Sequence, residues 1–419
     1  MSESRRLVVL DPCFASAVGH HADVNALLMP MLQQQGWRPE LWADAAAAGQ
    51  VALPGLRPLL RNGGYIDPRH WCDLAGSLHQ AALLRPQLEV AAAGNEPVAV
   101  WLAHSLVPFQ LIALAQQLQR VPASRVVVSL MFAPGELFDG QADLDLDAQR
   151  SAAALNARSA LAALALACSR GRHQLLLCAG SQQLIERYSP LCAAVGLEKP
   201  LLHPALVVGD DLPAVPAAGA SAPQQVLLHL GDRKPDKGRE LALAVLERLL
   251  QKATLPEPLQ KVHWWFHAAS REPPVPAEAE LLLRASADAQ ITVLEGPLPR
   301  PQLQQQLAQS SLALLPYCPK AYTERSSGVL WLYGAARFAA QQCPRVVGHA
   351  GGWMAAEAQA LGLLWRPLPI QSAADLVFEV MAEALAAPIP QPPLSPYGQQ
   401  VLGSGFGAWL VERLAADSL

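Results

Sequence analysis

Short apolar runs alternate along the chain with longer segments in which apolar residues recur at helical spacing. The short runs predict buried strands, and the longer segments predict helices. Strands are expected at 5–10, 37–42, 98–102, 125–131, 174–178, 226–230, 262–267, 291–294, 312–315 and 345–347. Helices are expected at 22–35, 152–168, 239–251, 278–285, 300–309, from 326 onward, at 373–386 and at 406–414. This alternation indicates an α/β fold in which helices cover both faces of parallel sheets.

The alternation is interrupted at 207–224, where proline, alanine and glycine predominate. We interpret this segment as an interdomain linker. It separates an N-terminal domain at 1–206 from a C-terminal domain at 225–390, and the remaining segment 391–419 contains a helix that could pack back on the N-terminal domain. Both domains are expected to be Rossmann-like, doubly wound parallel sheets that face a cleft. Ligands of such sheets bind beyond the carboxyl ends of the strands.

Composition narrows the class of protein. Of the 419 residues, 52% are hydrophobic and 16% are charged, so a large core is available, and the net charge of −4 argues against nucleic-acid binding. The seven cysteines have no metal-binding spacing and the polar start MSESRR is no export signal, so reduced thiols in the cytoplasm are expected. The apolar segment 152–168 contains Asn156 and Arg158 and is expected to fall short of a membrane span. A soluble protein with peripheral membrane contact is compatible with this pattern.

The stretch 316–338 carries the clearest candidate chemistry. Ser326, Ser327 and Gly328 open a helix that continues through Val329, directly after a predicted strand and loop. The first N–H groups of a helix lack internal partners, and together with the helix dipole they favour an anion. An ordinary N-cap explains the same residues equally well, and the sequence leaves both interpretations open.

Four segments follow successive predicted strands: HLGDRKPDKG at 229–238, GPLPRPQLQQQLAQSSLALLPY at 296–317, TERSSGV at 323–329 and GGWM at 351–354. In this order they resemble the C-terminal domain of GT-B glycosyltransferases of the group-1, family-4-like kind, over residues 226–361. The resemblance implies a metal-independent, retaining hexosyltransferase without a cofactor. Its donor would be a nucleotide-sugar, its acceptor a glycan or lipid-linked acceptor, and its context bacterial polysaccharide synthesis.

The leaving diphosphate of a nucleotide-sugar needs fixed positive charge. Arg233 and Lys237 lie four positions apart on one loop and could converge on it, although a solvated turn would contain the same residues. Glu324 and Arg325 are expected to hold a sugar hydroxyl and a phosphate. The resemblance also places donor contacts at two neighbouring strand ends, namely Glu295 and Tyr317.

One departure from the family pattern concerns the second acid of its E-x7-E motif, which holds the donor ribose. The sequence has no Asp or Glu between Glu324 and Glu357. The expected position falls on Leu332 or Tyr333 when counted forward, and on Arg337 when counted back. Donor binding could be altered, or turnover lost.

Candidates for catalysis on the acceptor side come from the N-terminal half. Gly19, His20 and His21 occupy the first strand–helix loop, where the resemblance implies a donor contact for Gly19 and where an imidazole could contact a phosphate or orient a hydroxyl. His104 ends a predicted strand, and Glu136 is a weaker candidate. A polar helix start explains His20 and His21 equally well, and a structural role is the more common one for a lone strand-end histidine such as His104.

Two patterns are interpreted as unrelated to catalysis. Asp143, Asp145 and Asp147 form DLDLD, but they precede a helix rather than end a strand, so we expect helix-start chemistry and no metal. Gly63 and Gly64 lack the strand–helix context of a phosphate fingerprint. Two alternatives to a transferase remain: a protein of the same fold that binds a nucleotide-sugar or glycan without transfer, and a sugar-nucleotide epimerase.

Overall fold

The structure is a computed structural model that describes residues 5–17, 19–61, 63–64, 70, 72–93, 96–134, 152–209, 224–230, 234–251, 254–268, 274–296, 298–388 and 394–416. The chain folds as two compact units. Unit 1 comprises Met1–Val207 together with Phe406–Leu419, and unit 2 comprises Val208–Gly405. Most of the expected linker, together with Arg233, Glu136 and the three aspartates of DLDLD, lies outside the described residues.

Unit 1 is built on a seven-stranded sheet in the order β3-β2-β1-β4-β5-β6-β7, and its strand pairs are parallel. The strands are β1 (Arg6–Asp11), β2 (Arg38–Asp44), β3 (Leu56–Leu60), β4 (Val100–His104), β5 (Arg125–Leu130), β6 (Gln174–Ala179) and β7 (Leu201–Leu202). All residues of β1 and β4 are buried, which is why both read as unbroken apolar runs rather than alternating ones.

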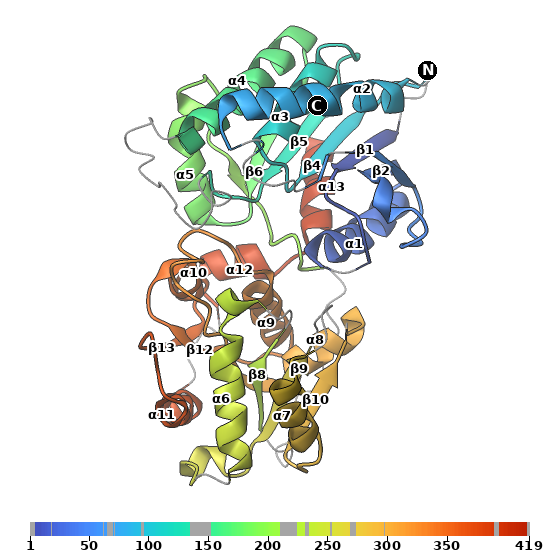
Figure 1. Ribbon diagram of the computed structural model, residues 1–419. Coiled ribbons are helices and arrows are strands. Elements are labelled where there is room, and N and C mark those ends of the chain that lie inside the picture. The colour runs from blue at the N-terminus through green and yellow to red at the C-terminus, as the bar shows by residue number, and fades with distance from the viewer. Residues whose placement is uncertain are drawn as a thin grey trace. The chain divides into compact units, whose positions relative to one another are not determined.

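Helices cover both faces of this sheet (Figure 1). They are α1 (His20–Gln34), α2 (Leu74–Ala92), α3 (Pro108–Leu118), α4 (Ala152–Gly171), α5 (Gln182–Ala193) and α13 (Phe406–Ala416), with a 3-10 turn η1 (Ala45–Ala47). The helices α2, α3, α4 and α5 share one hydrophobic core with the sheet, whereas α1 packs with α13. The C-terminal helix therefore belongs to unit 1, where the Phe406 ring lies 4.9 Å from that of His203.

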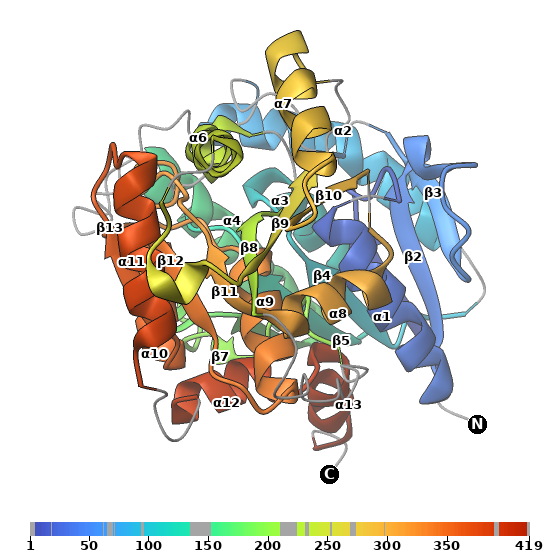
Figure 2. The same ribbon diagram turned by 90° about the horizontal axis from the view of Figure 1, so that it is seen from below.

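Unit 2 contains a six-stranded parallel sheet in the order β10-β9-β8-β11-β12-β13. Its strands are β8 (Gln225–His229), β9 (His263–Ala268), β10 (Ile291–Glu295), β11 (Ser310–Leu314), β12 (Arg345–His349) and β13 (Leu364–Leu368). Its helices are α6 (Arg239–Leu250), α7 (Pro276–Ser286), α8 (Arg300–Gln309), α9 (Gly328–Ala339), α10 (Gly352–Leu361), α11 (Ala374–Ala386) and α12 (Pro396–Leu402), with 3-10 turns η3 (Pro235–Lys237) and η4 (Glu257–Leu259). Helices α6, α7 and α11 share a core with the sheet, and α8, α9, α12 and α10 form a second layer (Figure 2).

The prediction of two Rossmann-like parallel sheets is confirmed by these two units. Every strand expected from an apolar run is present. Helices α2, α3, α5, α10 and α12 and the strands β3 and β7 were not predicted, and of these α2 and α5 contain the internal prolines Pro86 and Pro190. The strand β13 was also missed, since Pro367 breaks its apolar run.

Helix α4 corrects one expectation from the sequence. Among the described helices it is long and apolar enough to cross a membrane by length and composition, whereas the sequence predicted that it would fall short. Half of its apolar stretch is buried inside the fold, and Asn156 is fully buried among the alanines and leucines of the helix. Its apolar residues therefore serve the core of unit 1.

Candidate functional site

Two loops meet at the carboxyl edge of the unit 2 sheet. The loop after β8 contains Asp236, whose carboxylate lies 3.0 Å from the Arg325 guanidinium of the loop after β11. The backbone N–H of Cys318 donates to the Asp236 carbonyl at 2.8 Å. Gly238 approaches so closely that an added Cβ would lie 2.2 Å from the Pro316 carbonyl oxygen. The basic loop and the serine-rich helix start are therefore neighbours, although they are far apart in sequence.

A third loop, after β12, packs on the same segment. The N–H of Trp353 donates to the Tyr322 carbonyl at 2.8 Å, and a Cβ on Gly352 would lie 2.9 Å from that oxygen. The loops after β8, β11 and β12 thus form one continuous surface at the carboxyl edge, which is where open α/β sheets bind ligands.

This surface contains most of the donor-side residues predicted from the sequence. Ser327 is a true N-cap, because its Oγ accepts from the Leu330 N–H at 3.4 Å. Ser326, Gly328 and Val329 are half-buried beside it, and Lys237 is half-buried in the turn η3. The capping interpretation is correct for Ser327, and the anion-binding interpretation stays a prediction for the N–H groups of the first turn.

Arg325 has contacts that limit its freedom. Besides its ion pair with Asp236, its guanidinium stacks 5.5 Å above the ring of Tyr322. Tyr322 in turn packs against Tyr317, with ring centroids 4.8 Å apart, and both tyrosines are buried. Glu324 is also buried. We infer that the rings of Tyr317 and Tyr322 pack beneath the loop that carries Arg325 and support it.

The structure separates Glu295 from this group. It is exposed at the end of β10, which is the edge strand of the sheet. Three strand spacings, about 14 Å, separate β10 from β11. A donor contact by Glu295 stays a prediction that the positions of the other candidates do not support.

On helix α9, the positions where the family pattern places an acid are occupied by residues that pack in the interior of unit 2. Leu332 and Tyr333 are buried, and the Tyr333 hydroxyl contacts the carbonyls of Ser310 and Arg345, each at 3.1 Å. Arg337 is buried and donates to the Ala308 carbonyl at 2.7 Å. An acid at any of these positions would be buried inside unit 2.

Two histidines at neighbouring strand ends were not singled out from the sequence. His229 Nδ1 lies 3.0 Å from the His267 carbonyl, and His267 Nε2 lies 2.7 Å from the Gly296 carbonyl. Burial lowers the pKa of His229 to about 4, so its ring is neutral at pH 7. These bonds tie the ends of β8, β9 and β10 together beside the basic loop.

In unit 1, the acceptor-side candidates form a buried polar network at the ends of β1 and β4. His21 Nδ1 lies 2.8 Å from Asp11 Oδ1 and 3.0 Å from Oδ2. Asn25 donates from Nδ2 to Asp11 Oδ2 at 2.7 Å, and His104 Nε2 lies 3.1 Å from Asn25 Oδ1. Asp11 and Asn25 were not predicted from the sequence. The available signal was the carboxylate at a strand end, with His21 and Asn25 four positions apart on one helix face.

Each member of this network has a distinct environment. His104 has no exposed surface, and burial lowers its pKa to about 4, so it is a neutral hydrogen-bonding group. The side chain of His21 is 11% exposed, and the His20 ring lies 3.9 Å from its ring. Gly19, at the N-cap of α1, has a φ of 101° and open space where a Cβ would stand.

The backbone next to His104 is strained. Ser105 is buried and has a φ of 64°, a conformation that non-glycine residues seldom adopt and that often marks a functional site. Its Oγ lies 3.2 Å from His104 Nδ1. The strained residue thus helps to fix the orientation of the His104 ring.

The donor types of Asp11, His21 and His104 fit a divalent metal such as zinc. Their ligand atoms lie within 4.8 Å of one another, and two imidazoles with one carboxylate are a common zinc set. Each of these side chains is also satisfied by hydrogen bonds within the network. The absence of a metal, expected from the sequence, stays a prediction.

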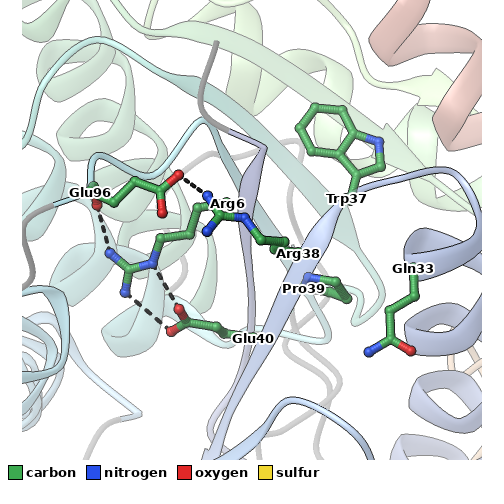
Figure 3. A pocket seen from close by; sticks show the side chains of 7 residues that line it. All are labelled: Arg6, Gln33, Trp37, Arg38, Pro39, Glu40 and Glu96. Carbon is green, nitrogen blue, oxygen red and sulfur yellow. Dashed lines mark hydrogen bonds and ion pairs between the residues drawn. The ribbon is translucent and has the colours of Figure 1, made fainter. Parts of the chain in front are cut away.

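A cavity of about 400 Å³ lies at the opposite edge of the unit 1 sheet (Figure 3). Arg6 and Arg38, the first residues of β1 and β2, line it together with Glu40 and Glu96. Arg6 Nε lies 2.8 Å from Glu40, and Arg38 pairs with Glu96. Because these charges neutralise one another at the amino ends of the strands, we assign the cavity a structural role.

The fold defined by the two units is the GT-B fold of glycosyltransferases. No protein-family model matches the sequence, and no curated protein matches it. Solved structures match over nearly the full length. A UDP-forming α,α-trehalose-phosphate synthase of Burkholderia xenovorans in complex with glucose-6-phosphate is 14% identical, with 99% of both chains covered and a TM-score of 0.54.

Two further structures show the same relationship. The UDP-forming synthase of Burkholderia vietnamiensis is 16% identical, with 100% of this chain and 99% of that chain covered and a TM-score of 0.54. Anabaena Alr3699/HepE in complex with UDP and glucose is 13% identical, with 98% and 99% covered and a TM-score of 0.51. At these identities the likeness establishes the fold, and confirms the resemblance to GT-B proteins at that level.

Proposed function

We propose that this protein is a glycosyltransferase that moves a sugar from a nucleotide-sugar donor to a hydroxyl-bearing acceptor. The observation that carries the proposal is the convergence, in unit 2, of the Lys237 loop and the start of α9 at one sheet edge, through the Asp236–Arg325 and Gly238–Pro316 contacts. A cationic side chain next to a helix N-terminus is suited to a leaving diphosphate. Similar folds have been solved with UDP and with glucose or glucose-6-phosphate.

On the donor side, we propose that Lys237 and Arg233 neutralise the diphosphate while the N–H groups of Gly328 and Val329 contact its oxygens. Arg325 would join them only after leaving Asp236. The nucleoside would then lie near Tyr317 and Glu324. The acceptor is proposed to be a glycan or lipid-linked acceptor, in bacterial polysaccharide synthesis, and His20, His21 and His104 act on its side.

Several finer features follow from the resemblance and remain part of the proposal. They are retention of the anomeric configuration, a metal-independent reaction without a cofactor, and action as a soluble cytoplasmic protein with peripheral membrane contact. Comparing the product anomer with that of the donor by NMR tests retention. Activity in the presence of EDTA tests metal independence.

A thermal-shift panel of UDP-, GDP-, ADP- and dTDP-sugars tests donor binding. A ligand at about 100 times its dissociation constant stabilises a protein by about 2.7 kcal/mol. One donor should shift the wild type and should shift Lys237→Ala much less. Lys261→Ala is the matched control, because this exposed lysine precedes β9 and therefore lies at the amino ends of the strands, opposite the proposed donor surface. No shift with any donor contradicts the proposal.

A second candidate function is binding of a nucleotide-sugar or glycan without transfer. It is favoured by helix α9, whose Leu332, Tyr333 and Arg337 are committed to packing where related enzymes are expected to hold the ribose. Release of nucleoside diphosphate from a donor that shifts the melting temperature, in the presence of an acceptor extract, identifies the transferase. Binding without release identifies the second function. An epimerase would change the sugar with donor alone.

A further inference from the structure

Two buried arginines of unit 2 lie at the amino edge of its sheet, which is the edge opposite the proposed donor surface. Arg345 is the first residue of β12, and Arg337 lies in the last turn of α9, the helix that precedes this strand. Their exposed fractions are 9% and 3%. A guanidinium keeps its charge in a protein, so two positive charges are held inside unit 2. Both need compensation, because burying an unpaired charge is costly.

Helix ends supply part of this compensation. Arg337 Nη1 donates to the Ala308 carbonyl, in the last turn of α8, at 2.7 Å. Arg345 Nη2 donates to the carbonyl of Ala387, which ends α11, at 3.3 Å. The last carbonyls of α9 itself accept from backbone N–H groups of the loop that follows it. Since a helix C-terminus carries only about half a negative charge, the ends of α8 and α11 offset about one of the two positive charges.

Side chains do not supply the remaining negative charge. Among the described residues, neither guanidinium forms an ion pair with a carboxylate, and both Nε–H groups are buried without a hydrogen-bond partner. The titratable groups that act on Arg337 are Tyr333, Cys343 and Arg345. Burial raises the pKa of Tyr333 to about 12 and also raises the pKa of the Cys343 thiol, so both groups are neutral at pH 7.

The two guanidiniums share one environment. Burial lowers the pKa of Arg337, and the charge of Arg345 lowers it as well. The charges of both arginines act on the Cys343 thiol. The Tyr333 hydroxyl, one helical turn before Arg337, lies 3.1 Å from the Arg345 carbonyl, so the end of α9 and the start of β12 are held together. Two like charges in one buried place point to a counter-ion that the chain itself does not provide.

We propose that Arg337 and Arg345 form a binding site for a phosphate dianion at the amino edge of the unit 2 sheet. The observation that carries the proposal is the burial of two guanidiniums, each with an unpartnered Nε–H, beside the uncharged side chains of Tyr333 and Cys343. A phosphate dianion offers the negative charge and the several acceptor oxygens that guanidinium groups match. Arg345, the more exposed of the two, is the side from which the anion enters.

This site is independent of the proposed glycosyl transfer. Lys237 follows β8 at the carboxyl edge of the sheet, whereas Arg345 begins β12 at the amino edge. Inorganic phosphate and the phosphate group of a monoester share the chemistry that the arginines recognise. The ligand is therefore a phosphate dianion from either source, and the binding experiment distinguishes the two.

Isothermal titration of the full-length protein in phosphate-free buffer tests the site. Inorganic phosphate should bind, and Arg345→Gln should weaken its binding about tenfold or more, since a charge-assisted contact is lost. Arg284→Gln, an exposed change on α7, is the control and should bind phosphate like the wild type. Glycerol 3-phosphate is titrated beside phosphate, with glycerol as its control. Tighter binding of glycerol 3-phosphate identifies a monoester as the ligand, and tighter binding of phosphate identifies the free anion.

The variant Lys237→Ala separates this site from the donor surface, because the surface proposed for the diphosphate could also attract phosphate. Lys237→Ala should keep the phosphate binding that Arg345→Gln loses. Phosphate binding that is lost in Lys237→Ala and kept in Arg345→Gln overturns the proposal. A protein that binds phosphate through Arg345 but is shifted by no nucleotide-sugar refutes only the proposed transferase.

A measurement on the wild type avoids any variant that fails to fold. In nitrogen-15 spectra of protein labelled in its arginines, the Nε–H signals of Arg337 and Arg345, assigned by correlation to the backbone, should shift on titration with phosphate. The Nε–H signal of the exposed Arg284 should stay in place. Signals of Arg337 and Arg345 that do not move as phosphate is added overturn the proposal, and the two arginines then serve only the ends of α8 and α11.

Discussion

The indole Nε1–H of Trp331 donates a hydrogen bond to Glu357 Oε1 at 2.9 Å. The Tyr397 hydroxyl donates to the same oxygen at 3.0 Å. One carboxylate, 1% exposed, therefore connects α9, α10 and α12 of unit 2. Glu357 is the first acid after Glu324 in the sequence, but its burial between these partners leaves it no route to a ribose.

The pH dependence of stability should report on Glu357. Burial raises its pKa to about 7, against hydrogen bonds from Trp331 and Tyr397 that lower it. Because the folded-state pKa exceeds the ordinary value of 4.5, the protonated form is favoured in the native state, and stability is lost as pH rises through about 7. The cost above pH 7 is on the order of 3 kcal/mol. Urea unfolding at pH 5 and pH 8 should show this loss in the wild type and much less of it in Glu357→Gln.

Glu379→Gln, an exposed change on α11, is the control for that comparison. It should retain the wild-type pH dependence. Equal slopes for the wild type and Glu357→Gln between pH 5 and pH 8 would show that Glu357 is ionised throughout.

Substitutions of Asp236 and Lys237 should change the affinity for the nucleoside diphosphate in opposite directions. Asp236→Asn releases Arg325 and removes a negative charge from the surface that we propose binds diphosphate, so the nucleoside diphosphate should bind several-fold more tightly. Lys237→Ala should bind it at least tenfold more weakly. The half-exposed ion pair contributes only about 0–1 kcal/mol to folding, so the stability of Asp236→Asn should change little. Isothermal titration with UDP, GDP and ADP measures these affinities, and weaker binding by Asp236→Asn would count against the surface.

Gly238 should not tolerate a side chain. Its φ is +71°, and an added Cβ would lie 2.2 Å from the Pro316 carbonyl oxygen, so Gly238→Ala combines backbone strain with a clash between backbones. We expect a loss of at least about 2 kcal/mol. Gly196→Ala is the control, with a φ of +74° and nothing within 4 Å of an added Cβ, and should lose only the strain of about 1 kcal/mol. Urea midpoints of both variants check this order.

Arg239 and Glu278 form a buried ion pair in which Nε lies 3.0 Å from Oε1. Glu278→Gln leaves the guanidinium charge without its partner and should cost about 3 kcal/mol or more. Glu280→Gln, exposed on the same helix, should cost less than about 0.5 kcal/mol. Similar unfolding free energies for the two variants would refute the importance of the pair.

The strand–helix alternation was predictable because the parallel strands are buried on both faces. β1 and β4 read as apolar runs for that reason, and the loops after them could be placed without coordinates. Helix α2, which contains Pro86, escaped prediction because proline lowers helix propensity even where tertiary packing overrides it, whereas α1 was predicted in spite of Pro30.

The candidate sites were only partly predictable. His104 could be placed at a strand end and His21 on the first strand–helix loop, although His21 lies in the first turn of α1, and their connection through Asp11 and Asn25 depends on the adjacent pairing of β1 and β4. Likewise, Arg325 could be assigned to a phosphate from its position, whereas its partner Asp236 comes from a loop 89 residues earlier. Periodicity along one chain segment cannot specify such cross-loop charge pairing.

The return of the last helix to unit 1 has a practical consequence for dissecting the molecule. Unit 2 is an uninterrupted stretch of chain, whereas unit 1 is assembled from both ends of the polypeptide. A fragment that stops at residue 207 would leave α1 without α13, whose Leu410 and Leu414 are buried in the intact protein, and would uncover Met31, against which Gly407 is tightly fitted. Such a fragment should aggregate unless residues 406–419 are rejoined to it by a short linker.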